Sequence, residues 1–187
     1  MIEEIKRTVE ALRNGKVILY PTDTIWGIGC DASNAQAVDK IFEIKSRPTE
    51  KSMIVLLDDA IQLNKYIQEI PAIAWDLIEV ADKPLTIVYS GAKNLPSNVI
   101  NPDGSIAIRI VADPFCKQLI HRLGKPIIST SANLSGEMTP SNYSEISENI
   151  ISSVDYVVQH RRDDKSIKKP SSIIRLNHDG EIKIIRA

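Results

Sequence analysis

The side chains of this sequence that could do chemistry are scattered cations and a cluster of hydroxyl and amide groups. The cations are Lys45, Arg47, Lys51, Arg109 and Arg186. The hydroxyl and amide groups gather in the segment 129–136, which reads Ser-Thr-Ser-Ala-Asn-Leu-Ser-Gly. Such a set suits the binding of a polyanion and the stabilisation of charge by position, without a covalent intermediate.

Other familiar chemistries are absent from the sequence. It contains no G-x-x-x-x-G-K-[ST] loop, no G-x-G-x-x-G fingerprint and no G-x-S-x-G elbow. His121, His160 and His178 have no evident nucleophile beside them, so we expect them to be structural or solvated. Cys30 and Cys116 are isolated and lack metal-ligand spacing, which predicts reduced core cysteines in a cytoplasmic protein.

Length and composition predict one globular domain spanning residues 1–187. Of these residues, 43% are hydrophobic and 25% charged, and the net charge is -1. A near-neutral chain excludes a globally basic nucleic-acid binder but not a local basic patch. No apolar run reaches membrane-spanning length, and the first 15 residues lack the layout of a signal peptide.

The first two cations follow a predicted strand, loop and helix. The run Val17–Tyr20 predicts a buried strand that Pro21 ends, and residues 22–24 (Thr-Asp-Thr) then form a loop. After a second apolar run at 25–30, Ser33 and Gln36 have the spacing of a helical capping box.

That helix should carry Lys45 on its buried face. Val38, Ile41 and Phe42 begin an apolar stripe that Lys45 continues, and Pro48 disfavours helical geometry at Arg47. Taken alone, the stretch fits a snorkelling lysine and a solvated arginine at a helix C-terminus better than a binding site.

Arg109 lies on the most informative predicted strand, residues 105–110. Alternation places the three isoleucines on one face and Ser105, Ala107 and Arg109 on the other. The second face is small and polar, which suits the floor of a cleft or a solvent-exposed surface. Considered by itself, the pattern favours the solvent-exposed surface.

The hydroxyl-rich segment follows another predicted strand, which begins at Pro126. If its extended geometry persists, Ser129, Ser131 and Asn133 point the same way. A binding edge and an ordinary Ser/Thr-rich turn explain this pattern equally well.

The remaining elements predict the fold class. We expect helices at 2–12, 59–67, 71–81, 114–123 and 144–150, and strands at 53–57, 85–89, 154–158, 171–176 and 181–186. Strands and helices intermingle without the steady alternation of a doubly wound fold. The prediction is therefore an α/β domain with a mixed, largely antiparallel sheet flanked by helices.

Five segments carry a resemblance to a known family. They read Tyr-Pro-Thr-Asp-Thr-Ile-Trp-Gly-Ile-Gly from Tyr20, Lys-Ser-Arg-Pro from Lys45, Lys-Pro-Leu-Thr from Lys83, Ser-Ile-Ala-Ile-Arg from Ser105, and the segment 129–136. In these segments, from about residue 14 to 186, the chain resembles the YrdC/TsaC family of L-threonylcarbamoyladenylate synthases. The K-x-R and S-x-N signatures of that family stand at 45–47 and 131–133.

The resemblance implies an activity and a set of partners. Members of the family form threonylcarbamoyl-adenylate and pyrophosphate from L-threonine, bicarbonate and ATP, with Mg²⁺ accompanying the ATP. The product serves the threonylcarbamoylation of the adenosine next to the anticodon in tRNA, through downstream transfer proteins. The fold implied is a twisted sheet with a deep, positively lined concave face. Contact with tRNA or double-stranded RNA stays open.

Roles for individual residues come with the resemblance. The catalytic constellation it implies is Lys45, Arg47, Ser131 and Asn133. The implied ATP contacts are Arg47, Lys51, Ser105, Ser131, Thr139 and Arg186. The implied threonine contacts are Thr24, Arg109, Ser129 and Ser171. The family gives no metal ligands that can be carried over.

These roles agree with the chemistry of the side chains. The planar donor fork of Arg109 suits a carboxylate. The carbamate of threonine is already anionic, so its attack on the α-phosphorus needs no strong general base. Lys45, Arg47 and Mg²⁺ would neutralise charge on the phosphates.

Departures from the family pattern leave two alternatives. Leu56 stands where many relatives carry a histidine that contacts threonine, so the chain could instead be a paralogue that binds a nucleotide with another substrate. The basic run at 160–169 suggests an RNA-binding protein, but an aromatic content of 5% argues against a stacking surface for RNA.

Overall fold

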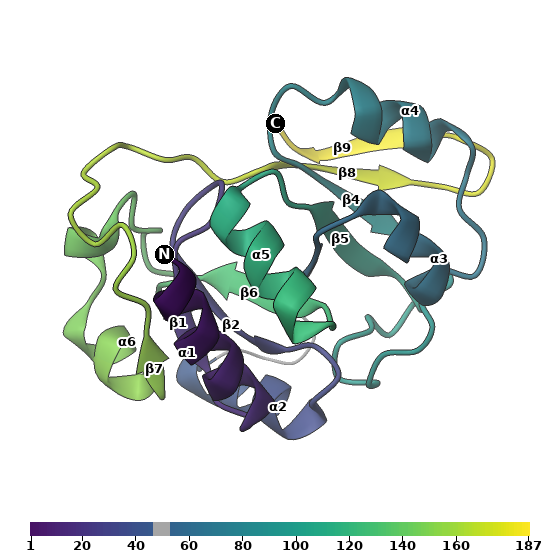
Figure 1. The fold of residues 1–187 in the computed structure, drawn as a ribbon. Helices are drawn as coiled ribbons and strands as arrows, with labels where there is room; N and C mark the ends of the chain where they lie inside the picture. Colours follow the sequence, from purple (N-terminus) through teal and green to yellow (C-terminus); the bar gives the residue numbers. More distant parts are fainter. Residues whose placement is uncertain (47–52) are drawn as a thin grey trace.

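The computed structural model describes residues 1–46 and 53–187, and within them nine strands form one sheet (Figure 1). The sheet order is β7-β1-β2-β6-β3-β5-β4-β8-β9. Five neighbouring pairs are antiparallel and three are parallel, which confirms the predicted mixed, largely antiparallel sheet. The strands are β1 (Ile18–Tyr20), β2 (Gly27–Asp31), β3 (Ile54–Leu57), β4 (Leu85–Tyr89), β5 (Ile106–Ile110), β6 (Ile127–Ser131), β7 (Tyr156–Val157), β8 (Ser172–Leu176) and β9 (Ile182–Arg186).

Helices lie on both faces of the sheet. They are α1 (Ile2–Arg13), α2 (Ala35–Ile44), α3 (Leu63–Tyr66), α4 (Ile73–Val80), α5 (Pro114–Leu123) and α6 (Glu148–Ser153), with 3₁₀ turns η1 (Ala60–Gln62) and η2 (Tyr143–Glu145). In Figure 1, α1 and α5 lie side by side in front of the central strands. None of the helices in the described part is long and apolar enough to cross a membrane.

The two faces of the sheet bury separate hydrophobic clusters. One cluster packs α1 and α5 against β1, β3 and β6, and includes Phe115, Leu56 and Ile127. The other packs α2 and α3 against the opposite face and includes Val55 and Ile108. Because side chains alternate along a strand, Ile54 and Ser129 share a face with Leu56 and Ile127. They lie beyond the cover of α1 and α5, where that face is open.

Tyr20 packs closely against a glycine strand under this cover. A Cβ atom at Gly29 would lie 2.4 Å from the carbonyl oxygen of Ile128 and 2.7 Å from Cε1 of Tyr20. Only glycine leaves this space, so the ring of Tyr20 lies directly over β2. The sequence Trp-Gly-Ile-Gly-Cys therefore builds a strand whose glycine face leaves room for the ring of Tyr20.

Two predicted helix starts are wrong. Asn34, not Ser33, caps α2, because its side chain accepts a hydrogen bond from the N–H of Ala37 at 3.1 Å. The hydroxyl of Ser33 instead donates to Asp31 Oδ1 at 2.7 Å. Helix α4 starts at Ile73, and Pro71 stands before it.

The segment 144–158 also differs from the prediction. Residues 143–145 form the turn η2, capped by Asn142, and α6 begins only at Glu148. Ile146 between them has an extended backbone, which interrupts the predicted continuous helix. The following strand is shorter than predicted, because only Tyr156 and Val157 pair with β1.

Candidate functional site

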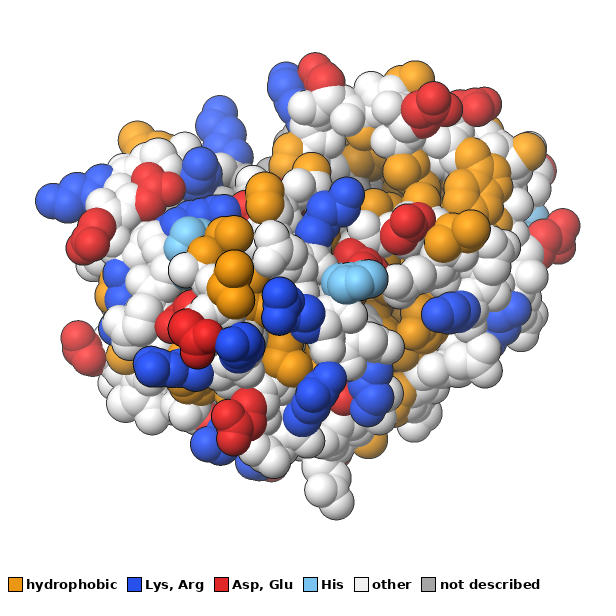
Figure 2. Space-filling model, viewed as in Figure 1, with side chains coloured by type: hydrophobic (Ala, Val, Ile, Leu, Met, Phe, Trp, Pro, Cys, Tyr) orange, Lys and Arg blue, Asp and Glu red, His pale blue; other side chains and the backbone are white. Residues whose placement is uncertain are grey.

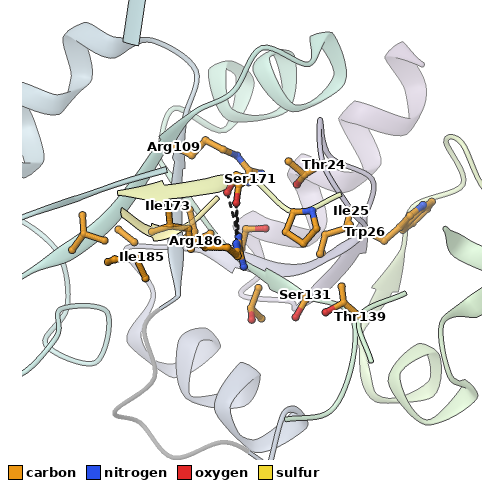
Figure 3. A pocket seen from close by; sticks show the side chains of 17 residues that line it. Thr24, Ile25, Trp26, Arg109, Ser131, Thr139, Ser171, Ile173, Ile185 and Arg186 are labelled. Atoms are coloured by element: carbon orange, nitrogen blue, oxygen red, sulfur yellow. Dashed lines mark hydrogen bonds between the residues drawn. The ribbon is translucent and has the colours of Figure 1, made fainter. Parts of the chain in front are cut away.

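A pocket of about 490 Å³ lies on the open part of the sheet face (Figure 3). It combines segments that are far apart in the sequence: the loop before β2, the ends of β6 and β9, and the middle of β5. The lining residues are Thr24, Ile25, Trp26, Gly27, Ile54, Val88, Ala107, Arg109, Ser129, Thr130, Ser131, Thr139, Pro170, Ser171, Ile173, Ile185 and Arg186. We call it the main pocket.

Arg109 is a buried cation in the wall of the main pocket. Its side chain is 4% exposed, and Nη2 lies 3.1 Å from Oδ1 of Asp23. Among the residues that the structure describes, Nε of Arg109 has no hydrogen-bond partner. The neighbour of Arg109 in the β3–β5 register is Leu56, which is fully buried. Arg109 therefore keeps donor capacity for an anionic group in the pocket.

Thr24 presents an acceptor to the pocket. The hydroxyl of Thr22 donates to the carbonyl oxygen of Ile25 at 2.8 Å, and it lies 2.9 Å from the hydroxyl of Thr24. Since Thr22 has one hydroxyl proton, Thr24 must be the donor in the bond between the two side chains. The lone pairs of Thr24 remain available to a ligand that donates, such as an amine or a hydroxyl.

Arg186 enters from β9 and is fixed by Ser171. Its Nε and Nη2 atoms donate to the carbonyl oxygen of Ser171 at 2.9 and 2.7 Å, as Figure 3 shows. The hydroxyl of Ser171 in turn lies 2.7 Å from that of Thr86. Burial, and then the like charge of Arg109, lower the pKa of Arg186 from its usual value. Two guanidinium groups thus share one pocket, which favours an anionic ligand.

Lys45 lies behind the pocket rather than in its lining. Its Nζ atom donates to the carbonyl oxygens of Ser131 at 2.6 Å and Asn133 at 2.5 Å. The residue is 2% exposed, which confirms the prediction that it continues the buried stripe of its helix. Lys45 therefore fixes the chain where it leaves β6, the strand that contributes Ser129 and Ser131 to the pocket.

Asn133 stabilises the turn that follows. Its Nδ2 atom donates to the carbonyl oxygens of Leu134 and Glu137, both at 2.9 Å. Oδ1 of Asn133 is buried and has no hydrogen-bond partner within the described ranges. In the S-x-N signature, Ser131 therefore lines the pocket, and Asn133 stabilises the loop beside it.

Ser105 does not join the lining of the main pocket. Its hydroxyl donates to Asp103 Oδ1 at 2.6 Å and accepts from Asn101 at 3.0 Å. The Ser105 hydrogen bond lowers the pKa of Asp103, which also pairs with Arg175 at 3.1 Å. Arg175 was missed from the sequence, although alternation along β8 puts it on the same face as Ile173.

The basic run at 160–169 is partly structural. Arg161 pairs with Asp113, the residue that caps α5. Arg162 donates to the carbonyl oxygens of Val157 and Val158, and its guanidinium lies 5.0 Å from the ring centre of Tyr143. The run therefore contributes two fewer free cations to any RNA surface.

The predicted site residues fall into four groups. The structure brings seven of them together in the main pocket: Thr24, Arg109, Ser129, Ser131, Thr139, Ser171 and Arg186. Lys45 and Asn133 are buried beside it, and Ser105 lies elsewhere. Arg47 and Lys51 lie outside the described residues. The prediction of a positively lined cleft is therefore supported within the described lining by two arginines, Arg109 and Arg186. The apolar walls, with Trp26, Ile173 and Ile185, were not predicted.

The sequence matches a family model over residues 10–187. The model is Sua5_yciO_yrdC, described as "Telomere recombination". A threonylcarbamoyl-AMP synthase of Pseudoalteromonas translucida is 38% identical over 157 residues, which cover 82% of this chain and 84% of that protein. A threonylcarbamoyl-AMP synthase of Vibrio cholerae is 38% identical over 140 residues, which cover 73% and 74% of the two chains.

Solved structures agree with the fold. E. coli YciO has a TM-score of 0.86 and 26% identity, covering 100% of this chain and 89% of that one. P. abyssi Sua5 in complex with L-threonine has a TM-score of 0.82 and 27% identity, covering 92% of this chain. The match takes in 50% of the Sua5 chain, so the present chain spans about half the length of that protein.

Proposed function

Because the chain belongs to the Sua5/YciO/YrdC family, we propose that it is a threonylcarbamoyl-AMP synthase. The reaction forms L-threonylcarbamoyladenylate and pyrophosphate from L-threonine, bicarbonate and ATP. Its curated relatives carry this enzyme name, and P. abyssi Sua5 has been solved with L-threonine. The product would pass to downstream proteins that modify tRNA in the cytoplasm.

One observation carries the proposal: two guanidinium groups and several hydroxyl groups from distant segments line a single pocket. The guanidinium groups belong to Arg109 and Arg186, and the hydroxyl-bearing residues include Thr24, Ser129, Ser131, Thr139 and Ser171. A nucleotide and an amino acid together present several anionic groups and several donors. The pocket has complementary groups for both, and its volume of about 490 Å³ suits small-molecule ligands.

The threonine is assigned to the Arg109 side of the pocket. The guanidinium offers parallel N–H donors to the carboxylate, and the free Nε adds to them. The acceptor lone pairs of Thr24 suit the amine or the hydroxyl of the substrate. Leu56 lies beside Arg109 in the sheet register, so the contact that a histidine makes in many relatives is replaced by an apolar neighbour.

The nucleotide is assigned to the side formed by Ser131, Thr139 and Arg186. Ile173 and Ile185 add an apolar wall next to Arg186, which suits a purine base (Figure 3). Arg47 and Lys51 stay predicted phosphate contacts. The described lining includes no acidic side chain, and no cluster of three metal-ligating side chains occurs in the described residues. We therefore expect Mg²⁺ to enter the site bound to the phosphates of ATP. The hydroxyl of Ser131 would then coordinate the ion or hydrogen-bond to one of its water ligands.

The chemistry then needs positioning more than proton transfer. The amine of threonine and bicarbonate first condense to the carbamate with loss of water. An oxygen of that carbamate then attacks the α-phosphorus, the bond from the α-phosphorus to the oxygen that bridges it to the β-phosphate breaks, and pyrophosphate leaves with both bonding electrons. Arg109 holds the amino-acid end of the attacking group, and Arg186 stabilises charge on the nucleotide. Lys45 positions the β6 end by its bonds to two carbonyl oxygens.

The test is an ATP–pyrophosphate assay with the purified protein. Pyrophosphate should be released only when ATP, L-threonine, bicarbonate and Mg²⁺ are all present. Pyrophosphate release that does not depend on threonine would reject the proposal. So would the absence of any release from a protein that binds ATP, and the chain would then be a nucleotide-binding paralogue.

A further inference from the structure

A second cavity, of about 270 Å³, lies on the opposite face of β4 and β5 from the main pocket. Its walls are mainly aliphatic and aromatic side chains: Ile78, Leu85, Ile87, Tyr89, Ile108 and Ile110. The last turn of α4 and the loop at 81–84 form one rim, and α5 forms the other. Figure 2 shows hydrophobic side chains gathered over this part of the surface, below α4.

Four charged side chains line the same cavity: Lys83, Lys117, Asp82 and Asp23. Within the described residues, Lys83, Lys117 and Asp82 form no ion pair, and Asp23 pairs only with Arg109. The cavity thus combines an apolar floor with two positive and two negative groups at its edges.

We propose that this second cavity binds a free amino acid with an aliphatic side chain. The volume lies just below the range of about 300–1,000 Å³ that is typical of drug-sized ligands, which points to a small occupant. The apolar walls suit an aliphatic side chain. The lysines match an α-carboxylate and the aspartates match an α-ammonium group, so a zwitterion complements both charges, whereas a simple anion or cation complements one.

Asp23 connects the second cavity to the main pocket. Asp23 is among the residues that line the second cavity, and its carboxylate lies 3.1 Å from the guanidinium of Arg109, which lines the main pocket. Both side chains are buried to 90% or more. An ammonium group near Asp23 would compete with Arg109 for that carboxylate and leave Arg109 freer to bind an anion.

The two sites should therefore be coupled. This coupling rests on the proposed function, in which L-threonine binds at Arg109. An aliphatic amino acid in the second cavity should then tighten the binding of L-threonine, and L-threonine should tighten the binding of the aliphatic amino acid by the same factor. Occupation of the second cavity itself does not depend on that function.

Isoleucine methyl groups can distinguish the two sites by NMR. Each cavity is lined by four isoleucines: Ile25, Ile54, Ile173 and Ile185 in the main pocket, and Ile78, Ile87, Ile108 and Ile110 in the second cavity. With δ1-methyl-labelled full-length protein, L-leucine should shift the second set in a saturable, millimolar titration. Shifts confined to the main-pocket set, or no saturable shift, would overturn the proposal.

Charge variants test the recognition of a zwitterion. L-Leucine should bind more tightly than 4-methylpentanoate or 3-methylbutylamine, which each keep one of its charges. Lys83→Gln and Lys117→Gln should each weaken leucine binding several-fold, while Lys65→Gln, an exposed lysine outside the cavity, should leave it unchanged. Equal binding of all three probes, or an equal effect of Lys65→Gln, would reject the assignment.

Calorimetry tests the coupling. The affinity for L-threonine, measured by calorimetric titration or from the methyl shifts of the main-pocket set, should rise several-fold in saturating L-leucine. An unchanged threonine affinity with leucine bound would overturn the link through Asp23. A protein that binds leucine in the second cavity but shows no threonine-dependent pyrophosphate release would instead count against the proposed function alone.

Discussion

The ammonium group of Lys45 donates to the main-chain carbonyl of Asn133 at 2.5 Å, so the first residue of K-x-R is bonded directly to the last residue of S-x-N. The same Nζ atom also donates to the carbonyl of Ser131 at 2.6 Å. The two signatures are therefore parts of one structural unit. Through these bonds the C-terminal end of α2 fixes the exit of β6.

Lys45→Met should cost both stability and turnover. Methionine keeps the apolar stem but leaves two buried carbonyl oxygens without their donor, at a cost of about 3 kcal/mol in unfolding free energy. Urea unfolding and the pyrophosphate assay measure the two effects. Lys40→Met, an exposed position on the same helix, is the matched control. Wild-type turnover in Lys45→Met would show that the bonds do not position the pocket.

Arg109→Lys should impair the use of threonine much more than that of ATP. Lysine keeps a positive charge beside Asp23 but loses the donor fork, so the KM for threonine should rise about tenfold or more. Steady-state kinetics with each substrate varied in turn give both KM values. A larger effect on the KM for ATP would move Arg109 to the nucleotide side.

Tyr20→Phe should leave the fold as stable as before or stabilise it by about 1 kcal/mol. Oη of Tyr20 is buried, and although the hydroxyl of Ser129 lies near it, no hydrogen bond of normal geometry reaches it among the described residues. A buried hydroxyl without a good partner is unfavourable. Urea unfolding of both proteins provides the comparison. Marked destabilisation would mean that the hydroxyl is bonded, with nearby Ser129 as the first candidate.

Gly29→Ala should destabilise the protein by about 3 kcal/mol, because its Cβ would lie 2.4 Å from a main-chain oxygen that cannot move aside easily. Gly104→Ala has nothing within 4 Å of the new Cβ, and its cost should be limited to about 1 kcal/mol of left-handed backbone strain. Thermal unfolding should rank the two variants in this order. The reverse order would contradict the close packing of Tyr20 on β2.

His160 should make the fold sensitive to acid. Burial, and then the charge of Arg161, lower the pKa of His160, whose ring stacks on Phe115 with 5.1 Å between centres. Because the folded state favours the neutral imidazole, its contribution to stability is complete above pH 6.5 and is lost as the pH falls through 6.5 toward the folded pKa.

His160→Gln should therefore reduce the fall in Tm between pH 8 and pH 5 relative to the wild-type protein. Thermal scans of the wild-type and variant proteins at several pH values measure this change. An unchanged pH dependence in His160→Gln would assign the acid sensitivity to other groups.

The sequence predicts much of the fold because several signals are local. Strands such as Ile54–Leu57 and the helix that Asp113 and Gly124 bound follow from apolar runs and caps in neighbouring residues. The start of α2 was mispredicted because Asp31, Ser33 and Asn34 are all able to cap. Asp31 takes Ser33 as a partner, which leaves Asn34 for the helix.

The site depends on relations that no local pattern contains. Alternation put Ser105 and Arg109 on one face, but only the position of α1 and α5 decides which part of that face stays open. Arg109 lies in the open part of this face, whereas Ser105 lies beyond the open part and bonds to Asp103. The pairing of Asp23 with Arg109 joins a loop to a strand 86 residues later, and spacing alone could not predict it.

The last strand of the sheet also sets the order in which the site can mature. Arg186 reaches the pocket from β9, whose neighbour in the sheet is β8, and both come after every other strand in the sequence. During synthesis on the ribosome, the emerging chain can assemble its central strands and the Thr24 and Arg109 side of the pocket first. The wall that Arg186 forms must wait until the final hairpin has emerged and folded back.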